Sequence, residues 1–515
     1  DGTRPSIIRF SADSTPKIDP AVITDLVGSV CVENLYDNLT YPDETPNLAT
    51  DWEASPDGLE YTFHLKEGVK FHSGNDLTAS DVVFSFNRFK TIGQGFAYLF
   101  DTVEECVADD DYTVRFVLAE PLGSFMGIIW HLYILDEETV MANIVDDGTY
   151  GEYGDYAMAW LLDNDAGSGP YTATEMVHSD YFLASRFPDW HMGWEGRENA
   201  PEQFQAIYLT EPSTQQTMMA NQELEISSPW FAPENYEALD EIEGVELAFT
   251  TWACTQYIFF NTQAAPTDDL NYRKALSCLL DYESFLGPVF YGAERSVGPV
   301  SSAINGHNDS CTTYNYDIEQ AKEYLAQSRY ADTYQDIELE CFLLDSAPAL
   351  EKMMLSLQAN CAQVGITMNI RKGPWLTYQE QISNPDSAPN VSTCNITPSV
   401  NDAASVMRTL FGSATQGTFE NPTWVSTPEL DERLDTAVTI LDTDERNAAA
   451  MELQDYVMAE LCASAPVADM ANPYAYQSTY IDWPVADYYN ETGELKYYAL
   501  GMDRYMPDIS MYTDR

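Results

Sequence analysis

The sequence predicts an α/β protein with more than one domain. Residues 204–209 are predicted to form a strand, 212–221 a helix and 224–226 another strand, which is a strand–helix–strand order. A helix is also predicted from residue 350 to the glycine at 365, with an alternating strand after it. The chain has 515 residues, of which 45% are apolar, so it exceeds one ordinary core. Two or three packed domains are therefore expected.

The N-terminal region predicts further strands and two helices. Residues 6–10 have strand composition, and an apolar helix is expected after the break at Asp19-Pro20. Residues 60–65 (EYTFHL) alternate in polarity, which predicts a strand, and a short strand is expected over 69–71. Thr78, with Asp81 three residues later, is the expected N-cap of the next helix.

The glycines near residue 167 predict a turn. Gly167, Gly169 and Pro170 could suggest a phosphate loop, but no Lys-Ser or Lys-Thr follows and no helix begins there. A turn between strands is therefore expected.

Two later helices have N-terminal signals. Asn271 is the expected cap of the first, and Asp317 with Gln320 forms a capping-box pattern for the second. Arg273 is expected to face outward or toward acidic neighbours in a salt bridge, with a role in ligand binding as the alternative.

The charge of the chain is strongly negative. It has 24 basic and 83 acidic residues, a formal net charge of -59, which repels phosphate backbones and anionic membranes. Nucleic acid is therefore excluded as an expected partner. Because the acids are scattered, they are expected to form solvated faces, with a cation-attracting cleft or a salt-adapted source as alternatives.

The cysteines lie singly and show no C-x-x-C spacing, which argues against a structural zinc site. Cys278 and Cys361 occupy apolar positions of predicted helices and are expected to be buried. The odd count leaves at least one thiol unpaired, and disulfides among the others stay open. The nine positions are 31, 106, 254, 278, 311, 341, 361, 394 and 462.

Signatures of catalysis and of membrane spans are missing from the sequence. The six histidines show no H-E-x-x-H pattern, and Gly-x-Ser-x-Gly does not occur. The chain is therefore not expected to be an enzyme, with an acidic hydrolase as a remote alternative, and no cofactor or metal is expected. No window approaches 18 consecutive apolar residues, so no membrane span is expected.

Four segments resemble the extracellular solute-binding proteins of family 5, the peptide, dipeptide and nickel receptors of ABC importers. They are DGLEYTFHLKEGVKFHSGNDLTASDVVFSFNR within residues 51–89, and the stretches at 260–292, 316–325 and 350–370. The resemblance implies a type II periplasmic-binding-protein fold, with two lobes of mixed sheets joined by a hinge and an accessory α+β domain. Gln222 stands where this family usually has glycine, so a different local turn is expected there.

The resemblance also implies a domain layout in which the chain enters one lobe more than once. The first lobe is expected to combine residues 1–48, 168–250 and 468–515, the accessory domain to fill 49–167, and the second lobe to span 251–467. Crossing strands near residues 250 and 467 would form the hinge.

The ligand of this family lies between the lobes, held partly by backbone groups of a strand that precedes a helix in the second lobe. The matching stretch is NVSTCNITPSVNDAASVMRTLFGS, from residue 390 to 413. The aspartate that binds a peptide's α-ammonium falls on Ser399, which has no charge. Asp402 matches the acid of the family's Asp-Pro pair and could compensate, as could another acid.

Further lining residues follow from the same matching, with ordinary core or loop as the alternative for each. From the second lobe they are Thr393, Asn395, Ile396 and Thr397, and from the first lobe Thr24 and Asp25. Aromatic side chains line peptide and sugar sites, so Trp252 and Trp375 rank first, followed by Tyr257 and Trp230.

The resemblance implies capture of a small peptide or peptide-like solute by hinge closure, and delivery to an ABC permease and its ATPase. Alternatives are a receptor for an oligosaccharide, an opine-like compound or a metal chelate, or a receptor for signalling. A monomer is expected at the extracellular face of the membrane or in the periplasm, with an N-terminal lipid anchor as its contact with the membrane.

Overall fold

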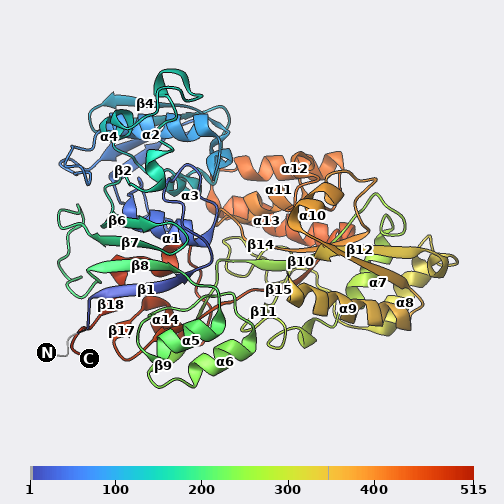
Figure 1. Cartoon of the computed structure of the whole chain (residues 1–515). Coiled ribbons are helices and arrows are strands. Elements are labelled where there is room, and N and C mark those ends of the chain that lie inside the picture. The colour runs from blue at the N-terminus through green and yellow to red at the C-terminus, as the bar shows by residue number, and fades with distance from the viewer. Residues whose placement is uncertain (1–3, 346) are drawn as a thin grey trace. The chain divides into compact units, whose positions relative to one another are not determined.

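A computed structural model describes residues 4–345 and 347–515 of the chain. It divides into two compact units (Figure 1). The first unit comprises Asp1–Thr250 and Asn472–Arg515, and the second comprises Thr251–Ala471. The chain therefore passes from one unit to the other twice. The finer division into lobes and an accessory domain stays a prediction.

The main sheet of the first unit has the strand order β1-β8-β7-β6. Its first pair is parallel and the other two pairs are antiparallel. Phe10 and Phe204 pack face to face in its core, 6.3 Å apart between ring centroids. The strands are β1 (Ile7–Ala12), β6 (Tyr171–Val177), β7 (Tyr181–Arg186) and β8 (Gln203–Tyr208). The turn expected near residue 167 therefore leads into β6.

Helix α1 (Leu26–Leu35) is buried along its whole length and contacts β6 (Figure 1). Its Glu33 is 4% exposed, and the carboxyl Oε1 accepts a hydrogen bond from the Tyr133 hydroxyl at 2.6 Å. Within the described ranges, no basic side chain lies within 4 Å of this carboxyl. Burial therefore raises the pKa of Glu33 to about 8, although the Tyr133 bond lowers it somewhat.

A second sheet of the first unit has the order β2-β3-β5-β4 and is antiparallel throughout. Phe116 packs edge to face against both Phe63 and Phe86, at 5.7 Å in each case. Phe86 belongs to α2, which contacts β4 and β5 (Figure 1). The elements are β2 (Ala49–Ala54), β3 (Glu60–Leu65), β4 (Val103–Asp110), β5 (Thr113–Leu118) and α2 (Ala79–Ile92).

The predicted cap of α2 is confirmed, whereas the predicted strand over 69–71 is wrong. The Thr78 side chain and the Asp81 side chain cap the first turn reciprocally. Residues 70–76 instead fold back on themselves, because the Phe71 amide donates to the Asn75 carbonyl at 3.0 Å. Lys70 and Asp76 form an isolated bridge instead of a strand, and their side chains form an ion pair at 2.6 Å.

The buried ion pairs of the first unit include those of Arg88 with Asp19 and of His72 with Asp165. The Arg88 guanidinium binds both Asp19 oxygens, at 2.8 and 2.6 Å. His72 binds the Asp165 carboxylate through Nδ1 and the Gly169 carbonyl through Nε2 at 2.9 Å. Burial lowers the pKa of His72, but the Asp165 charge outweighs burial, so the pKa of His72 is raised. Burial likewise raises the pKa of Asp165, but the His72 charge outweighs it, so the pKa of Asp165 is lowered.

The remaining strand pairs of the first unit involve its C-terminal segment, residues 472–515. β9 is antiparallel to β16, and β17 to β18. The helices α6 and α14 both contact β9. The elements are β9 (Val245–Thr250), β16 (Asn472–Gln477), β17 (Ile481–Asp482), β18 (Ser510–Met511), α3 (Phe125–Ile128), α4 (Glu137–Ala142), α5 (Pro212–Ala220), α6 (Pro233–Asp240) and α14 (Pro484–Thr492).

Two expectations near residue 224 are wrong. In place of a strand over 224–226, only isolated bridges of Ile226 to Phe10 and Tyr476 form, and Pro229 shortly after has no amide to continue pairing. Gln222 has φ +58°, the left-handed conformation that favours glycine. The glutamine therefore adopts the turn that glycine suits, instead of forming a different one.

The second unit is built on one mixed sheet of order β11-β15-β10-β14-β12-β13. β12 is parallel to β13 and β14, and the other pairs are antiparallel. The neighbouring interior strands β10 and β15 are buried throughout. The strands are β10 (Thr255–Phe260), β11 (Glu294–Arg295), β12 (Glu338–Leu344), β13 (Thr367–Gly373), β14 (Val391–Ile396) and β15 (Ser464–Asp469).

Helices cover both faces of this sheet. Figure 1 shows α7 to α9 on one side and α10 to α13 on the other. Tyr272, Leu276 and Met353 are among the fully buried residues of the first group. The helices are α7 (Leu270–Cys278), α8 (Ile318–Gln327), α9 (Pro348–Gln363), α10 (Trp375–Ile382), α11 (Ala403–Phe411), α12 (Pro428–Thr439) and α13 (Thr443–Tyr456).

The predictions for α7 are wrong in two respects. Asp269 caps the helix, accepting from the Tyr272 amide at 2.9 Å, so Asn271 lies inside it. Arg273 is buried and donates to the carbonyls of Thr267 and Leu461, both at 2.6 Å, instead of facing an acid. The short π-helix that ends at Leu461 leaves its last carbonyls free, and the guanidinium satisfies them.

Other expected helix signals are present in the second unit. Asp317 caps α8 and accepts from the Gln320 amide at 2.9 Å, although the Gln320 side chain binds Glu323 and does not complete a capping box. Gly365, with φ +87°, separates α9 from β13 as predicted. All nine cysteines are buried and free, which confirms burial of Cys278 and Cys361. Over the described ranges, no helix has the length and apolarity to cross a bilayer.

Candidate functional site

Three of the predicted lining residues, Thr393, Asn395 and Ile396, lie on strand β14, and Thr397 directly follows it. The Thr393 hydroxyl is buried, donates to the Tyr257 carbonyl at 2.7 Å and accepts from the Gln256 side chain at 2.8 Å. Asn395 is exposed, whereas Ile396 is buried. Thr393 and Ile396 therefore stabilise the sheet, and Asn395 is the side chain of this strand that is open to solvent.

One edge of β14 is only partly paired. β10 pairs with β14 along its full length, from Val391 to Ile396. β12 pairs with it only at Val391 and Ser392. From Thr393 onward, β14 therefore has a neighbouring strand on one side only, and outward-facing backbone groups are left for another partner.

The loop from β14 to α11 holds the two residues predicted to read a peptide amine. Ser399 is half-buried. Asp402 is 4% exposed, and it caps α11 through the Ser405 amide and hydroxyl at 2.9 and 2.7 Å. Its other oxygen accepts from Arg446 Nε at 2.7 Å. Both Asp402 oxygens are thus engaged within the second unit, so compensation for Ser399 by Asp402 would require these contacts to break.

The predicted aromatic residues differ in exposure. Trp252 is buried, and Tyr257 is buried with its hydroxyl donating to the Pro299 carbonyl at 2.8 Å. Trp375, the first residue of α10, is 38% exposed and stacks on Tyr378 at 5.7 Å. Of these three, only Trp375 is exposed to solvent.

The first unit contains the other three predicted residues. Thr24 is exposed, and Asp25 caps α1 by accepting from the Gly28 amide at 2.8 Å. Trp230 is exposed as well. Their roles at a ligand stay predictions, like those of the second-unit residues.

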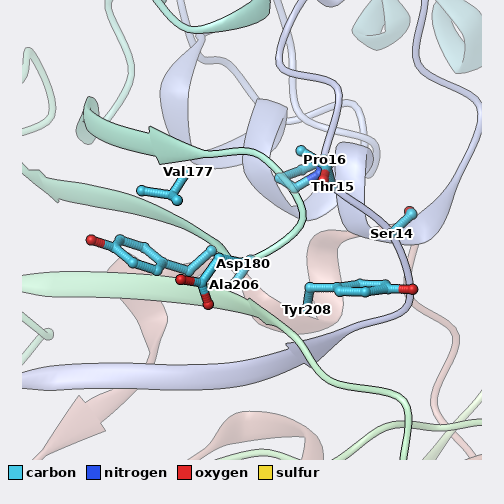
Figure 2. A pocket seen from close by; sticks show the side chains of 8 residues that line it. Ser14, Thr15, Pro16, Val177, Asp180, Ala206 and Tyr208 are labelled. Atoms are coloured by element: carbon cyan, nitrogen blue, oxygen red, sulfur yellow. The ribbon is translucent and has the colours of Figure 1, made fainter.

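Neither of two concave regions on the units contains a predicted site residue. In the first unit, a crevice too narrow to admit a water-sized sphere lies between the end of β8 and the β6–β7 turn (Figure 2). It is lined by Ser14, Thr15, Pro16, Val177, Asp180, Tyr181, Ala206 and Tyr208. In the second unit, a polar concavity of about 440 Å³ lies beside the N-terminus of α8, with Lys274 and Glu460 in its wall.

Two residues near β14 have no motif in the sequence. Cys254 is buried, and its side chain interacts with Asn395 and Thr397; burial raises the pKa of this thiol to about 11. Glu420 is a half-buried carboxylate after α11. The sequence shows 83 acidic residues, so only the environment of Glu420 in the fold distinguishes it.

Two α/β units connected by two chain crossings are the framework of hinged binding proteins. The sequence profile of the bacterial extracellular solute-binding proteins, family 5 (middle region), matches residues 44–418. The chain belongs to this family. It is therefore a solute-binding protein and not an enzyme.

The sequence similarity to known relatives covers most of the chain. The probable D,D-dipeptide-binding periplasmic protein DdpA of Escherichia coli is 25% identical over 436 residues, 84% of this chain and 79% of its own. The heme-binding protein A of Haemophilus influenzae is 26% identical over 433 residues, 78% of this chain and 75% of its own.

Solved structures share the fold over the full length. The ABC transporter substrate-binding protein CtaP of Listeria monocytogenes has a TM-score of 0.83 at 20% identity, covering 98% of this chain and 99% of its own. The periplasmic binding protein DppA of Helicobacter pylori, in complex with the peptide STSA, has a TM-score of 0.77 at 21% identity, covering 99% of each. These likenesses confirm the predicted α/β binding-protein fold.

Proposed function

We propose that this protein is the substrate-binding component of an ABC importer and captures a small peptide or peptide-like solute. The family is defined by solute binding, and the similar proteins include a dipeptide receptor and a receptor with a bound peptide. The similar heme-binding protein shows that the ligand varies among relatives, so the peptide class needs support from this chain itself.

The open edge of β14 is the observation that carries the peptide proposal. From Thr393 to Ile396, backbone groups on the side away from β10 have no partner strand. A peptide lying in extended form along this edge would complete those hydrogen bonds through its own amides and carbonyls. The exposed Asn395 and the half-buried Thr397 lie at the same stretch and offer polar side chains to the ligand.

Closure and delivery are further parts of the proposal. The two chain crossings, at residues 250–251 and 471–472, permit a hinge motion that encloses the ligand. The closed monomer would then present the solute to a membrane permease with its ATPase. An N-terminal lipid anchor would hold it at the outer face of the membrane, and nucleic acid takes no part.

A non-peptide ligand is the second candidate, favoured by two observations. Ser399 has no charge for a peptide ammonium, and Asp402 is engaged by Arg446 and the helix N-terminus. Trp375 is 38% exposed, and a flat or sugar-like solute could stack on the accessible part of its ring. Oligosaccharides, opine-like compounds and metal chelates are the classes to compare.

The test is mass spectrometry of ligand released from protein purified without refolding, followed by thermal shift with the ligand classes. A bound peptide, and melting temperatures raised by peptides, would support the proposal, because ligand binding stabilises the native state by mass action. If saccharides or chelates raise the melting temperature and no peptide does, the peptide proposal is wrong. Thr397→Ala and Trp375→Ala should weaken binding with little change in the melting temperature of the free protein.

A further inference from the structure

The loop that follows α11 presents Phe419 and Glu420 on a tight turn. The Gly417 amide donates to the Asn421 carbonyl at 3.0 Å, which closes the turn around both residues. The Asn421 side chain is fully buried and donates to the Gly412 carbonyl at 2.8 Å. The turn is therefore held in place by hydrogen bonds of its own residues.

The same loop is fastened to α10. Trp424 donates from Nε1 to the Ile382 carbonyl at 3.0 Å, at the end of that helix. Trp424 has φ +54°, a left-handed conformation that a bulky residue adopts only where its surroundings require it. The loop thus keeps a defined position beside α10 at the expense of local backbone strain.

An aromatic wall joins this turn to the first residues of α10. The Phe419 ring meets Trp375 edge to face at 5.3 Å, and Trp375 stacks on the buried Tyr378. Trp375 stays 38% exposed in this arrangement. Trp375 is therefore only partly covered by its two aromatic neighbours, and Glu420 directly follows Phe419 in the chain.

Glu420 lies close to β14 without a partner for its charge. No side chain in the described ranges forms a hydrogen bond or ion pair with this half-buried carboxylate. Burial raises its pKa. Burial also raises the pKa of the Cys394 thiol on β14 to about 12, with a smaller contribution from the Glu420 charge, which places the carboxylate near that strand.

We propose that Glu420 is the subsite for a cationic group of the ligand, an ammonium or a guanidinium, with Trp375 and Phe419 beside it as an apolar wall. A half-buried carboxylate without a partner is unfavourable, and a bound cation removes that cost through a charge-assisted hydrogen bond. The aromatic faces add attraction for the same cation. This inference rests on the proposed function and deepens it, because Glu420 supplies the negative charge that Ser399 lacks.

The test is a thermodynamic cycle by isothermal titration calorimetry. The probes are alanine-based tripeptides with a free or an acetylated N-terminus, and the proteins are the full chain and E420Q. Acetylation and E420Q should each weaken binding about 10- to 100-fold, and the two together should weaken it no more than either alone. E429Q is the matched control, since Glu429 is an exposed acid of the same unit, and it should bind as the unchanged protein does.

The outcomes separate this inference from the proposed function. If free-amine peptides bind, and acetylation weakens their affinity for E420Q as much as their affinity for the unchanged protein, the peptide function stands and the Glu420 subsite is refuted. If spermidine or glucosamine binds in place of peptides and E420Q loses it, the subsite stands and the peptide function fails. If only neutral saccharides or chelates bind, or the folded protein binds no probe, both fail. E420Q should melt no lower than the unchanged protein, because it removes an unpaired charge.

Discussion

Replacement of Glu33 by glutamine is expected to make the first unit more stable at neutral and alkaline pH. Glu33 is enclosed on α1 with the Tyr133 hydroxyl as its hydrogen-bond donor. Its carboxyl has a pKa of about 8 in the fold against an ordinary value of 4.5. Glutamine keeps the acceptor oxygen and the shape, but it has no charge to bury.

The sign follows from proton uptake in the two states. In the unfolded chain the carboxyl ionises near pH 4.5, whereas in the folded chain it stays protonated until about pH 8. The free energy of unfolding therefore falls as pH rises through this window and levels off above it. At about 1.4 kcal/mol per pH unit, the window corresponds to a loss of about 5 kcal/mol that E33Q avoids.

The assay is urea unfolding followed by circular dichroism from pH 5 to pH 9, together with hydrogen exchange of the α1 amides. The free energy of unfolding of E33Q should exceed that of the unchanged protein by a margin that grows with pH, to about 5 kcal/mol. E104Q, at an exposed position of β4, should show no such growth. A difference between E33Q and the unchanged protein that is constant with pH would refute a protonated carboxyl in the core.

Three other predictions concern charge elsewhere in the chain. Ser399→Asp is expected to introduce or improve binding of free-amine peptides in calorimetry, and an equal gain for acetylated peptides would contradict its place at an amine. Asp165→Asn leaves His72 buried without its carboxylate and should cost about 3–5 kcal/mol in urea unfolding. Because the pKa of Asp165 is lowered from 3.8 and that of His72 is raised from 6.5, this loss should be largest between those pH values, and a flat profile would contradict the pairing. The net charge of -59 predicts a melting temperature that rises with KCl, which scanning fluorimetry checks; no rise up to 1 M would contradict self-repulsion.

Local signals in the sequence predicted many elements because their physics is local. The Thr78 and Asp81 cap depends on residues three apart, and Gly365 separates helix from strand by its own backbone preference. Arg273 was predicted wrongly because its partners, the carbonyls of Leu461 and Cys462, lie almost 190 positions away. The predicted cap at Asn271 failed since the neighbouring Asp269 competes for the same role.

The candidate site was predictable only in part. The matching of residues 390–413 located β14 and the loop before α11. It did not show that β12 pairs with β14 only at Val391 and Ser392, because this depends on strand register. Nor did it show that Arg446 engages Asp402 from another helix. Glu420 differs from the other acids only through the turn and the aromatic wall around it, which bring together residues from two separate segments.

The buried thiols are natural probes of local unfolding in this protein. Burial raises the pKa of each cysteine, so an alkylating reagent should modify a thiol only after its surroundings have unfolded. Cys31 and Cys106 belong to the first unit, and the others belong to the second. A short pulse of reagent during denaturation, read by peptide mass, would therefore report which unit loses its packing first, without any introduced label.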